Sequence, residues 1–245
     1  MAAEAVSEPT AKRFVAELRE RQSDEELQKI QRYFKSGAGE YGEGDVFLGV
    51  RMGDVFALAK RYVEMPPEEI EKLLESELHE ARAGGCSVMA KQAARRGTSE
   101  ERRGELYSLY RRRIDRINNW DLVDLAARDV VGRWLHDKPR EPLEEMARSN
   151  DVWERRTAIY ATSFQIRQGE LDETFRIAGI LASDDHDLIQ KSVGGWLREA
   201  GKHDESRLLA FLDEHAASMD PTAVRYATEK LSPEQRRRYR RGAAG

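Results

Sequence analysis

Apolar residues recur at helical spacing along most of this chain. From Arg51 onward they fall three and four residues apart, and no segment alternates in the manner of a β-strand. The clearest stripes are Ile70, Leu73, Leu74 and Leu78; Trp153, Ala158, Ile159 and Phe164; Leu188, Ile189, Val193 and Leu197; and Leu208, Leu209 and Leu212. This pattern predicts an all-α protein.

Short breaks separate the helical segments, and each contains proline, glycine, asparagine or serine. The breaks are Pro66-Pro67, Gly97-Thr98, Asn118-Asn119, Pro139 to Pro142, Asn150, Ser183 and Gly201. No single segment can bury its own apolar stripe, so we expect stacked pairs of helices. We predict a right-handed α-solenoid of degenerate HEAT-like repeats, formed by one domain over residues 1–245. About residues 1–8 are expected to be disordered and about residues 240–245 to be a tail. The arginine-rich run from Arg236 to Arg241 is expected to be solvated.

Two further helical segments are predicted between Pro9 and Lys35. The sequence Ser23-Asp24-Glu25-Glu26 is typical of a helix cap, and it precedes apolar residues at helical spacing. The glycine-rich stretch that follows, residues 36–49, contains a G-x-G-x-x-G string. It follows a helix rather than a strand, and no helix begins at its third glycine, so a dinucleotide site is excluded. The stretch is expected to be a shaped connector, either purely structural or touching a ligand through Lys35 or Tyr41.

Composition indicates a soluble protein. The mean hydropathy is -0.74, and no apolar run approaches the roughly 20 residues that span a bilayer. The first eight residues lack the pattern of a signal peptide. The one cysteine, Cys86, is interpreted as a small packing residue. We therefore expect a cytoplasmic protein.

Charge is distributed unevenly along the chain. The net charge is -4, which by itself argues against a nucleic-acid-binding protein. Residues 35–80 carry -6, whereas residues 81–160 carry +4. A basic face on an acidic protein is compatible with this distribution.

The most chemically varied stretch is Arg111 to Leu135. Asn118 or Asn119 can cap a helix that begins near Trp120. Trp120 and Asp124 are four residues apart and therefore share a face of that helix, with Arg128 one turn further along. Its buried stripe is predicted to consist of Leu122, Val123, Ala127, Val130 and Val131. Positive charge just before the turn comes from Arg111, Arg112, Arg113 and Arg116.

Two interpretations of this stretch remain open from spacing alone. An aromatic plane, a carboxylate and phosphate-binding charge could converge to form a site. Alternatively, Trp120 could be a core anchor, and Asp124 with Arg128 an ordinary surface ion pair.

Other classes of catalytic site are not supported by the residue inventory. The histidines, His79, His136, His186, His203 and His215, are scattered. No HExxH string or Cys/His pair has the spacing of metal ligands. We expect neither a metal nor a cofactor.

Four segments together resemble the AlkD-like family of HEAT-repeat DNA alkylation repair glycosylases. They are Phe34-Lys35 through GEYGEGDVFLGV, then RINNWDLVDL, WERRTAI and IQKSVGGWLRE, and the resemblance extends over about residues 30–240. It implies a C-shaped solenoid whose basic concave face binds duplex DNA. It also implies a base excision repair enzyme that hydrolyses the N-glycosidic bond of alkylated purines, usually 3-methyladenine and 7-methylguanine. We expect the protein to be a monomer.

The resemblance also implies roles for individual residues. Asp124 corresponds to the catalytic aspartate, Trp120 to an aromatic residue at the lesion, and Arg156 to an arginine on the DNA backbone. Further contacts to the backbone are expected from Arg155, Arg128, Arg198 and Lys35. Fixed arginines of this kind set the position of a protein on DNA.

The chain departs from the family pattern at two places. The second lesion-site tryptophan of the family follows the glycine of K-x-h-G-W, where h is apolar, but here Gly195 stands at that position and Trp196 comes one residue late. A shift of one residue rotates a side chain about 100° around a helix. Either the helix unwinds so that Trp196 reaches the lesion, or Trp196 packs in the core. The second departure, the small residues at 84–87, predicts loose packing.

The implied chemistry suits these residue types. Alkylation makes the purine cationic and weakens its glycosidic bond, so no general acid is needed. A carboxylate such as Asp124 can stabilise the positive charge that develops on the sugar. Two alternatives remain: a non-catalytic relative that binds damaged or branched DNA, and a HEAT-like protein-interaction scaffold. Steep salt dependence would separate the DNA binder from the scaffold.

Overall fold

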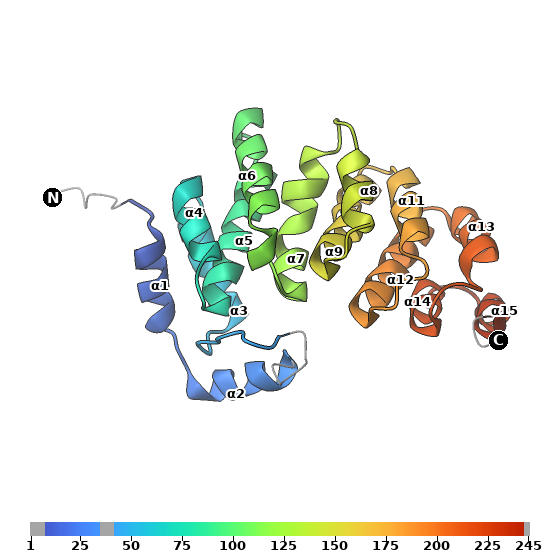
Figure 1. Cartoon of the computed structure of the whole chain (residues 1–245), viewed down its shortest axis with the longest axis horizontal. Coiled ribbons are helices and arrows are strands. Elements are labelled where there is room, and N and C mark those ends of the chain that lie inside the picture. The colour runs from blue at the N-terminus through green and yellow to red at the C-terminus, as the bar shows by residue number, and fades with distance from the viewer. Residues whose placement is uncertain (1–7, 35–41, 243–245) are drawn as a thin grey trace. The chain divides into compact units, whose positions relative to one another are not determined.

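The computed structural model describes residues 8–34 and 42–242 (Figure 1). The regular elements of these residues are helices, and the one β-type contact among them is an isolated bridge between Val46 and Leu78. The all-α prediction is confirmed. Within these residues, no helix has both the length and the apolar character that crossing a bilayer requires. Lys35 and Tyr41 lie outside the described residues.

The chain divides into two compact units. The N-terminal unit is Met1–Ala126 and the C-terminal unit is Ala127–Gly245. The boundary falls where helix α7, Trp120–Ala126, passes into a π-helical segment, η2, Ala127–Gly132. Each unit is described separately.

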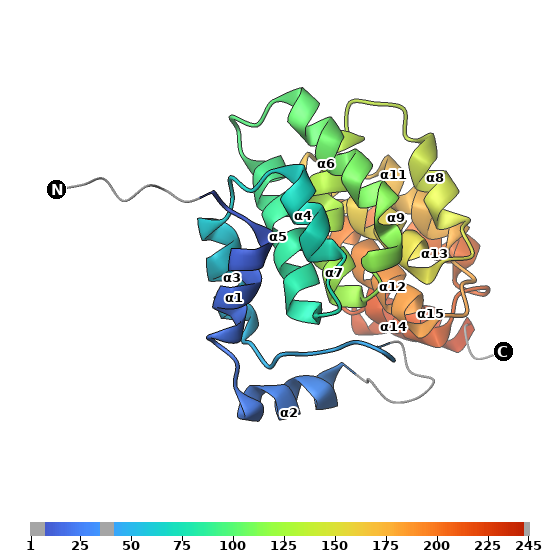
Figure 2. The same cartoon turned by 60° about the vertical axis from the view of Figure 1, so that its left-hand side comes forward.

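The N-terminal unit is built around one long helix, α5. Its elements are α1 (Ala11–Arg19), α2 (Asp24–Tyr33), α3 (Met52–Arg61), α4 (Pro67–Leu74), α5 (His79–Ala94), α6 (Glu100–Arg112), the 3-10 turn η1 (Ile114–Arg116) and α7. Helices α3 and α7 pack against α5, while α4 contacts α1 on one side and α6 on the other in a second layer (Figure 2). Helix α2 buries no residue and is set apart from these layers in both views.

The C-terminal unit repeats the two-layer arrangement. Its helices are η2, α8 (Glu141–Ala147), α9 (Val152–Ala161), α10 (Ser163–Arg167), α11 (Asp172–Ile180), α12 (Asp187–Gly201), α13 (Glu205–His215), α14 (Pro221–Ala227) and α15 (Pro233–Gly242). In one layer η2 contacts α9, α9 contacts α12, and α12 contacts α14; in the other α8 contacts α11. This stacking is consistent with an α-solenoid.

The helix boundaries follow from local sequence. The side chain of Ser23 accepts a hydrogen bond from the backbone N–H of Glu26, as the predicted cap requires. Pro67 is the first residue of α4, where its missing N–H costs no hydrogen bond. The predicted stripe beyond Trp120 is confirmed. Leu122, Val123, Ala127, Val130 and Val131 are all buried.

The arginine-rich end is not wholly a solvated tail. Residues 233–242 form α15, and Tyr239 is buried in it. The hydroxyl of Tyr239 donates to the carbonyl of Leu209 at 3.3 Å and lies 2.8 Å from a carboxylate oxygen of Asp213. Because one aromatic side chain anchors the helix to α13, the arginines before it lie on an ordered surface.

The prediction of loose packing at residues 84–87 is wrong. A methyl group added at Gly84 would overlap the ring of Phe14 from α1, and one added at Gly85 would lie 3.1 Å from Leu74 of α4. Phe14 is fully buried. The small residues therefore permit close approach of α1 and α4 to α5 rather than leaving space.

We expect Gly84→Ala to lower the free energy of unfolding by about 1–3 kcal/mol, because the added methyl group overpacks a filled site. Urea denaturation measures this loss. The matched control is Gly53→Ala in α3, where nothing lies near the added carbon, and where alanine stabilises a helix by up to about 1 kcal/mol. Equal effects of the two substitutions would contradict close packing at Gly84.

Candidate functional site

Helix α7 places Trp120 and Asp124 beside one another in the N-terminal unit. The side chain of Asn119 accepts a hydrogen bond from the backbone N–H of Trp120 at 2.8 Å, which starts the helix at Trp120. Both Trp120 and Asp124 are half-buried, and both line the same cavity. The sequence prediction that these two side chains share a face therefore agrees with their position.

The cavity has a volume of about 670 Å³ and mostly apolar walls. Five segments form it: α2, the connector that leads into α3, the first turns of α3, the start of α5, and α7. The aromatic side chains among its walls are Tyr33, Phe34, Phe47, Phe56 and Trp120. Charged groups from Glu26, Lys29, Arg51 and Asp124 also line it. A flat, cationic ligand would find both aromatic surface and negative charge there.

The indole of Trp120 is part of an aromatic cluster. Phe34 stacks on it with ring centroids 5.5 Å apart and planes at 18°, so one face of the indole is covered. Tyr33 meets it edge-on at 5.8 Å and is 65% exposed. A ligand that stacks on Trp120 must therefore use the other face, with Tyr33 as an accessible neighbour.

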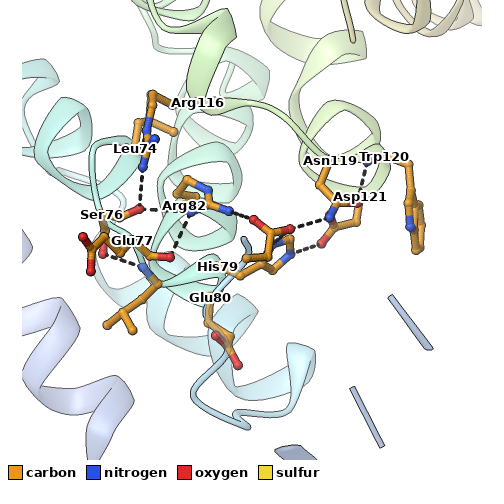
Figure 3. A network of polar contacts seen from close by, with 12 residues as sticks. Leu74, Ser76, Glu77, His79, Glu80, Arg82, Arg116, Asn119, Trp120 and Asp121 are labelled. Atoms are coloured by element: carbon orange, nitrogen blue, oxygen red, sulfur yellow. Dashed lines mark hydrogen bonds and ion pairs between the residues drawn. The ribbon is translucent and has the colours of Figure 1, made fainter. Parts of the chain in front are cut away.

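A buried polar network lies behind Trp120 (Figure 3). The Nε2 atom of His79 is 2.8 Å from Asp121, and its Nδ1 atom is 3.5 Å from Asp45. Asp45 also accepts a hydrogen bond from Asn119 at 2.7 Å and pairs with Arg82. The network joins the connector, α5 and the first turn of α7.

The electrostatics of this network favour a protonated His79. Burial lowers the pKa of His79, but the negative charges of Asp121 and Asp45 outweigh burial and raise that pKa to about 9. Burial raises the pKa of Asp45, but His79, Arg82 and Asn119 outweigh it and bring the pKa below its usual range. Two positive and two negative groups therefore lie together out of water.

Sequence reasoning missed this network. His79 was one of five scattered histidines, and nothing in the local sequence relates it to Asp45 or Asp121. The sequence does place His79, Glu80 and Arg82 close together at the start of α5. All three side chains are buried in the structure, and buried charges need partners.

Glu80 fixes the connector that carries Phe47. Its carboxylate accepts hydrogen bonds from the backbone N–H groups of Leu48, Gly49 and Val50 at 2.9 to 3.1 Å. Gly49 has a φ of 83°, which suits glycine. One buried side chain thus takes the place of a secondary-structure partner for three consecutive residues.

The arginines before Asn118 do not converge on Trp120 and Asp124 as the sequence suggested. Arg112 forms a paired contact with Glu71 at 3.1 and 2.8 Å. Arg113 pairs with Glu71 and Glu75. Arg116 donates to the carbonyls of Leu74, Glu75 and Ser76, at the C-terminus of α4. These three side chains join α6 and η1 to α4, and none of them lines the cavity.

Arg156 is the most deeply buried of the predicted DNA-binding arginines that the structure describes. It is buried in the C-terminal unit and donates to the carbonyl of Leu188 at 3.0 Å, to Ser192 at 2.7 Å and to the hydroxyl of Tyr160 at 2.9 Å. Its guanidinium also lies 4.5 Å from the centre of the Tyr160 ring. Tyr160 was not among the predicted site residues, although it is four residues beyond Arg156.

The other predicted arginines have acidic partners within the C-terminal unit. Arg155 pairs with Asp184 at 2.7 Å. Arg198 pairs with Glu199 at 3.2 Å and with Glu229. Arg128 donates to Asp129 at 2.9 Å. To bind a DNA phosphate, each of these arginines would have to contact the phosphate together with its carboxylate partner or release that carboxylate.

Trp196 packs within the C-terminal unit. Helix α12 continues through Gly194 and Gly195, so it does not unwind there. Trp196 packs against a cluster of Ile166, Leu171 and Ala200, and it meets Tyr160 edge-on at 5.2 Å. Nothing lies within 4 Å of a carbon added at Gly195. The position at which the resemblance expects an aromatic side chain is therefore open.

Comparison with protein families gives a match over residues 14–231 to the model described as DNA alkylation repair enzyme. The chain belongs to the DNA alkylation repair enzyme family. That membership confirms the resemblance inferred from the four sequence segments. No curated protein matches the chain significantly.

A solved structure supports the fold of this DNA alkylation repair family member. That structure is of a predicted DNA alkylation repair enzyme from Enterococcus faecalis, which is 20% identical to this chain in sequence and superimposes with a TM-score of 0.68. The match covers 87% of this chain and 98% of the other. Among residues 8–34 and 42–242 of this chain, no group of three or more His, Cys, Asp or Glu residues is placed to bind a metal ion.

Proposed function

We propose that this protein is a DNA N-glycosylase that hydrolyses the N-glycosidic bond of cationic alkylated purines in duplex DNA. The substrates are 3-methyladenine and 7-methylguanine, and the protein acts as a monomer without a cofactor. The observation that supports this proposal most directly is the placement of Trp120 and Asp124 on one cavity of the N-terminal unit. Membership of a DNA alkylation repair family supports it independently.

Asp124 supplies the electrostatic stabilisation. A purine alkylated at N3 or N7 is already positively charged, so it leaves without protonation. Positive charge then builds on the deoxyribose, and a fixed carboxylate nearby stabilises that charge and orients the attacking water. The reaction therefore needs the negative charge of Asp124 more than it needs a proton donor.

Trp120 supplies a surface for the cationic base or sugar. A cation over an indole face gains roughly 0.5–2 kcal/mol. Phe34 covers one face of Trp120 and fixes the plane of the ring, so the remaining face is pre-positioned. Trp196 is the second proposed lesion contact. Its packing against Ile166 and Leu171 reduces the indole surface that a lesion can contact.

Arginines are proposed to bind the DNA backbone. Arg156 is the strongest candidate because Tyr160 and Ser192 fix the orientation of its guanidinium, and pre-oriented arginines bind phosphate with little loss of entropy. Arg155, Arg128, Arg198 and Lys35 are proposed as additional contacts.

A second candidate function is a non-catalytic protein that binds damaged DNA. The open position at Gly195 favours it, because the chain lacks an aromatic side chain where the family pattern has one. This alternative retains the DNA contacts and predicts no chemistry.

The test is release of free base from a duplex that contains one 7-methylguanine, at saturating protein, with a protein-free sample to subtract spontaneous loss. The proposal predicts release, together with DNA binding that weakens steeply between low and physiological salt. Salt-sensitive binding without release would favour the non-catalytic function. Absence of both release and binding would exclude both functions.

A further inference from the structure

The first turn of α7 rests on one buried imidazole. The Nε2 atom of His79 is 2.8 Å from Asp121, and Asp121 lies between Trp120 and Asp124 in the same turn of helix. His79 is 1% exposed and Asp121 7%. Any shift of the ring would therefore move the turn that carries both proposed lesion-site side chains.

A second connection reaches the same turn through the other ring nitrogen. Nδ1 of His79 is 3.5 Å from Asp45. Asp45 accepts a hydrogen bond from Asn119, and the side-chain oxygen of Asn119 accepts the backbone N–H of Trp120. Both nitrogens of one ring thus connect to the start of α7.

Aromatic packing provides a third connection. The ring of His79 contacts Phe34 at 5.0 Å and Phe47 at 4.8 Å between centroids. Phe34 in turn stacks on Trp120 (centroids 5.5 Å apart). The imidazole therefore supports the indole as well as the helix.

This arrangement favours a doubly protonated ring, with Nε2 at 2.8 Å from Asp121 and Nδ1 at ion-pair distance, 3.5 Å, from Asp45. A neutral imidazole donates from only one nitrogen, whereas both nitrogens of His79 face carboxylates. The charged or titratable groups near it come from several elements. They are Asp121 of α7, Asp45 of the connector, Glu80, Arg82 and Cys86 of α5, and, across the cavity, Glu26 and Lys29 of α2. Arg82 offsets one of the two aspartates, so loss of the His79 proton would leave a buried negative charge uncompensated.

We propose that His79 is a positioning residue, which fixes Trp120 and Asp124 for base excision through Asp121, Asp45 and Phe34. This inference rests on the proposed glycosylase function. His79 itself does not touch the substrate. It acts through the helix turn and the aromatic ring that do.

The proposal predicts a specific alkaline limit. The pKa of His79 is raised from 6.5 to about 9 in the folded protein. The stability contributed by its ion pairs is therefore fully present below about pH 6.5 and is lost as the pH rises through about 9. Positioning of α7, and with it the rate of excision, should decline over the upper part of that range.

The experiment compares single-turnover excision of 7-methylguanine by wild type and by His79→Gln between pH 6 and pH 10. Any effect of pH on the substrate itself cancels in the ratio of the two rates. At pH 7 we expect His79→Gln to be slower by at least about tenfold, with DNA affinity nearly unchanged, since small misplacements of reacting groups reduce rates strongly. The ratio should approach one as the pH passes about 9. A ratio near one at pH 7, or a ratio independent of pH, would overturn the proposal.

Two further variants keep the result interpretable. His203→Gln removes an exposed histidine. This variant should excise 7-methylguanine at the wild-type rate at every pH. If His79→Gln folds poorly, His79→Gln combined with Asp121→Asn removes both members of the closer ion pair. The remaining carboxylate, that of Asp45, keeps Arg82 as its partner. The double variant should excise slowly and show no dependence on the His79 titration. Wild-type excision by a folded double variant would contradict the proposal.

A measurement without substrate separates this inference from the proposed function. In NMR spectra of wild type, the His79 ring and the indole N–H of Trp120 should titrate together with a midpoint at about 9, and the change at Trp120 should be absent from His79→Gln. If wild type releases no base at any pH while these titrations coincide, the glycosylase function fails and the positioning of Trp120 by His79 stands. A Trp120 signal that does not follow His79 would refute the positioning.

Discussion

Base release is expected to fall by about 100-fold or more in Asp124→Asn, the loss seen when a fixed group that stabilises transition-state charge is removed. Asparagine preserves the size and planarity of the aspartate side chain and removes its negative charge. The positive charge that builds on the sugar then has no carboxylate beside it. Binding of the DNA should be retained or slightly strengthened, because one negative charge near the phosphates is lost.

The measurement is the single-turnover rate at saturating protein, with occupancy of the DNA confirmed separately for each variant. The control is Asp115→Asn, which removes one exposed carboxylate from η1 in the same unit and should leave the rate unchanged. A rate for Asp124→Asn within a factor of about two of wild type would show that the carboxylate stabilises no transition-state charge. An equal loss in both variants would show that the effect is not specific to the position of Asp124.

The positions of the helices were largely predictable because they depend on local sequence. Pro67, Asn119 and Asp151 each stand at or next to a helix start, and proline, asparagine and aspartate favour such positions for reasons contained within a few residues. Helix α15 at the C-terminus was not predicted, because it depends on a contact that is distant in sequence. Arginine content suggested a solvated tail, but burial of Tyr239 against α13 decides the structure of α15, and that contact is 26 to 30 residues away in sequence.

The candidate site was predictable only in its local part. Trp120 and Asp124 could be placed together because four residues make one turn of a helix. The partners of His79 could not, because Asp121 is 42 residues away and the Asn119–Asp45 contact spans 74. The same limit applies to charge. Arg112 and Arg113 counted toward a basic segment, yet their carboxylate partners lie on α4, outside that segment.

The connector that forms one wall of the cavity depends on a single buried carboxylate, that of Glu80. It accepts three consecutive backbone N–H groups, from Leu48 to Val50, and it is 2% exposed. Removing it leaves those three donors without a partner and out of reach of water. Each unsatisfied buried donor costs about 1–3 kcal/mol, and part of that cost is recovered when the connector loosens.

We therefore expect Glu80→Ala to lower the free energy of unfolding by about 3–5 kcal/mol, measured by urea denaturation. The control is Glu77→Ala, an exposed carboxylate three residues earlier, before α5 begins, which should change stability by less than about 0.5 kcal/mol. Because the connector also carries Asp45 and Phe47, loss of Glu80 should release the support that these residues give to His79. The Trp120 indole signal should then broaden or shift in Glu80→Ala under conditions where the protein is still folded. A stability loss equal to that of Glu77→Ala would mean that the connector does not depend on this carboxylate.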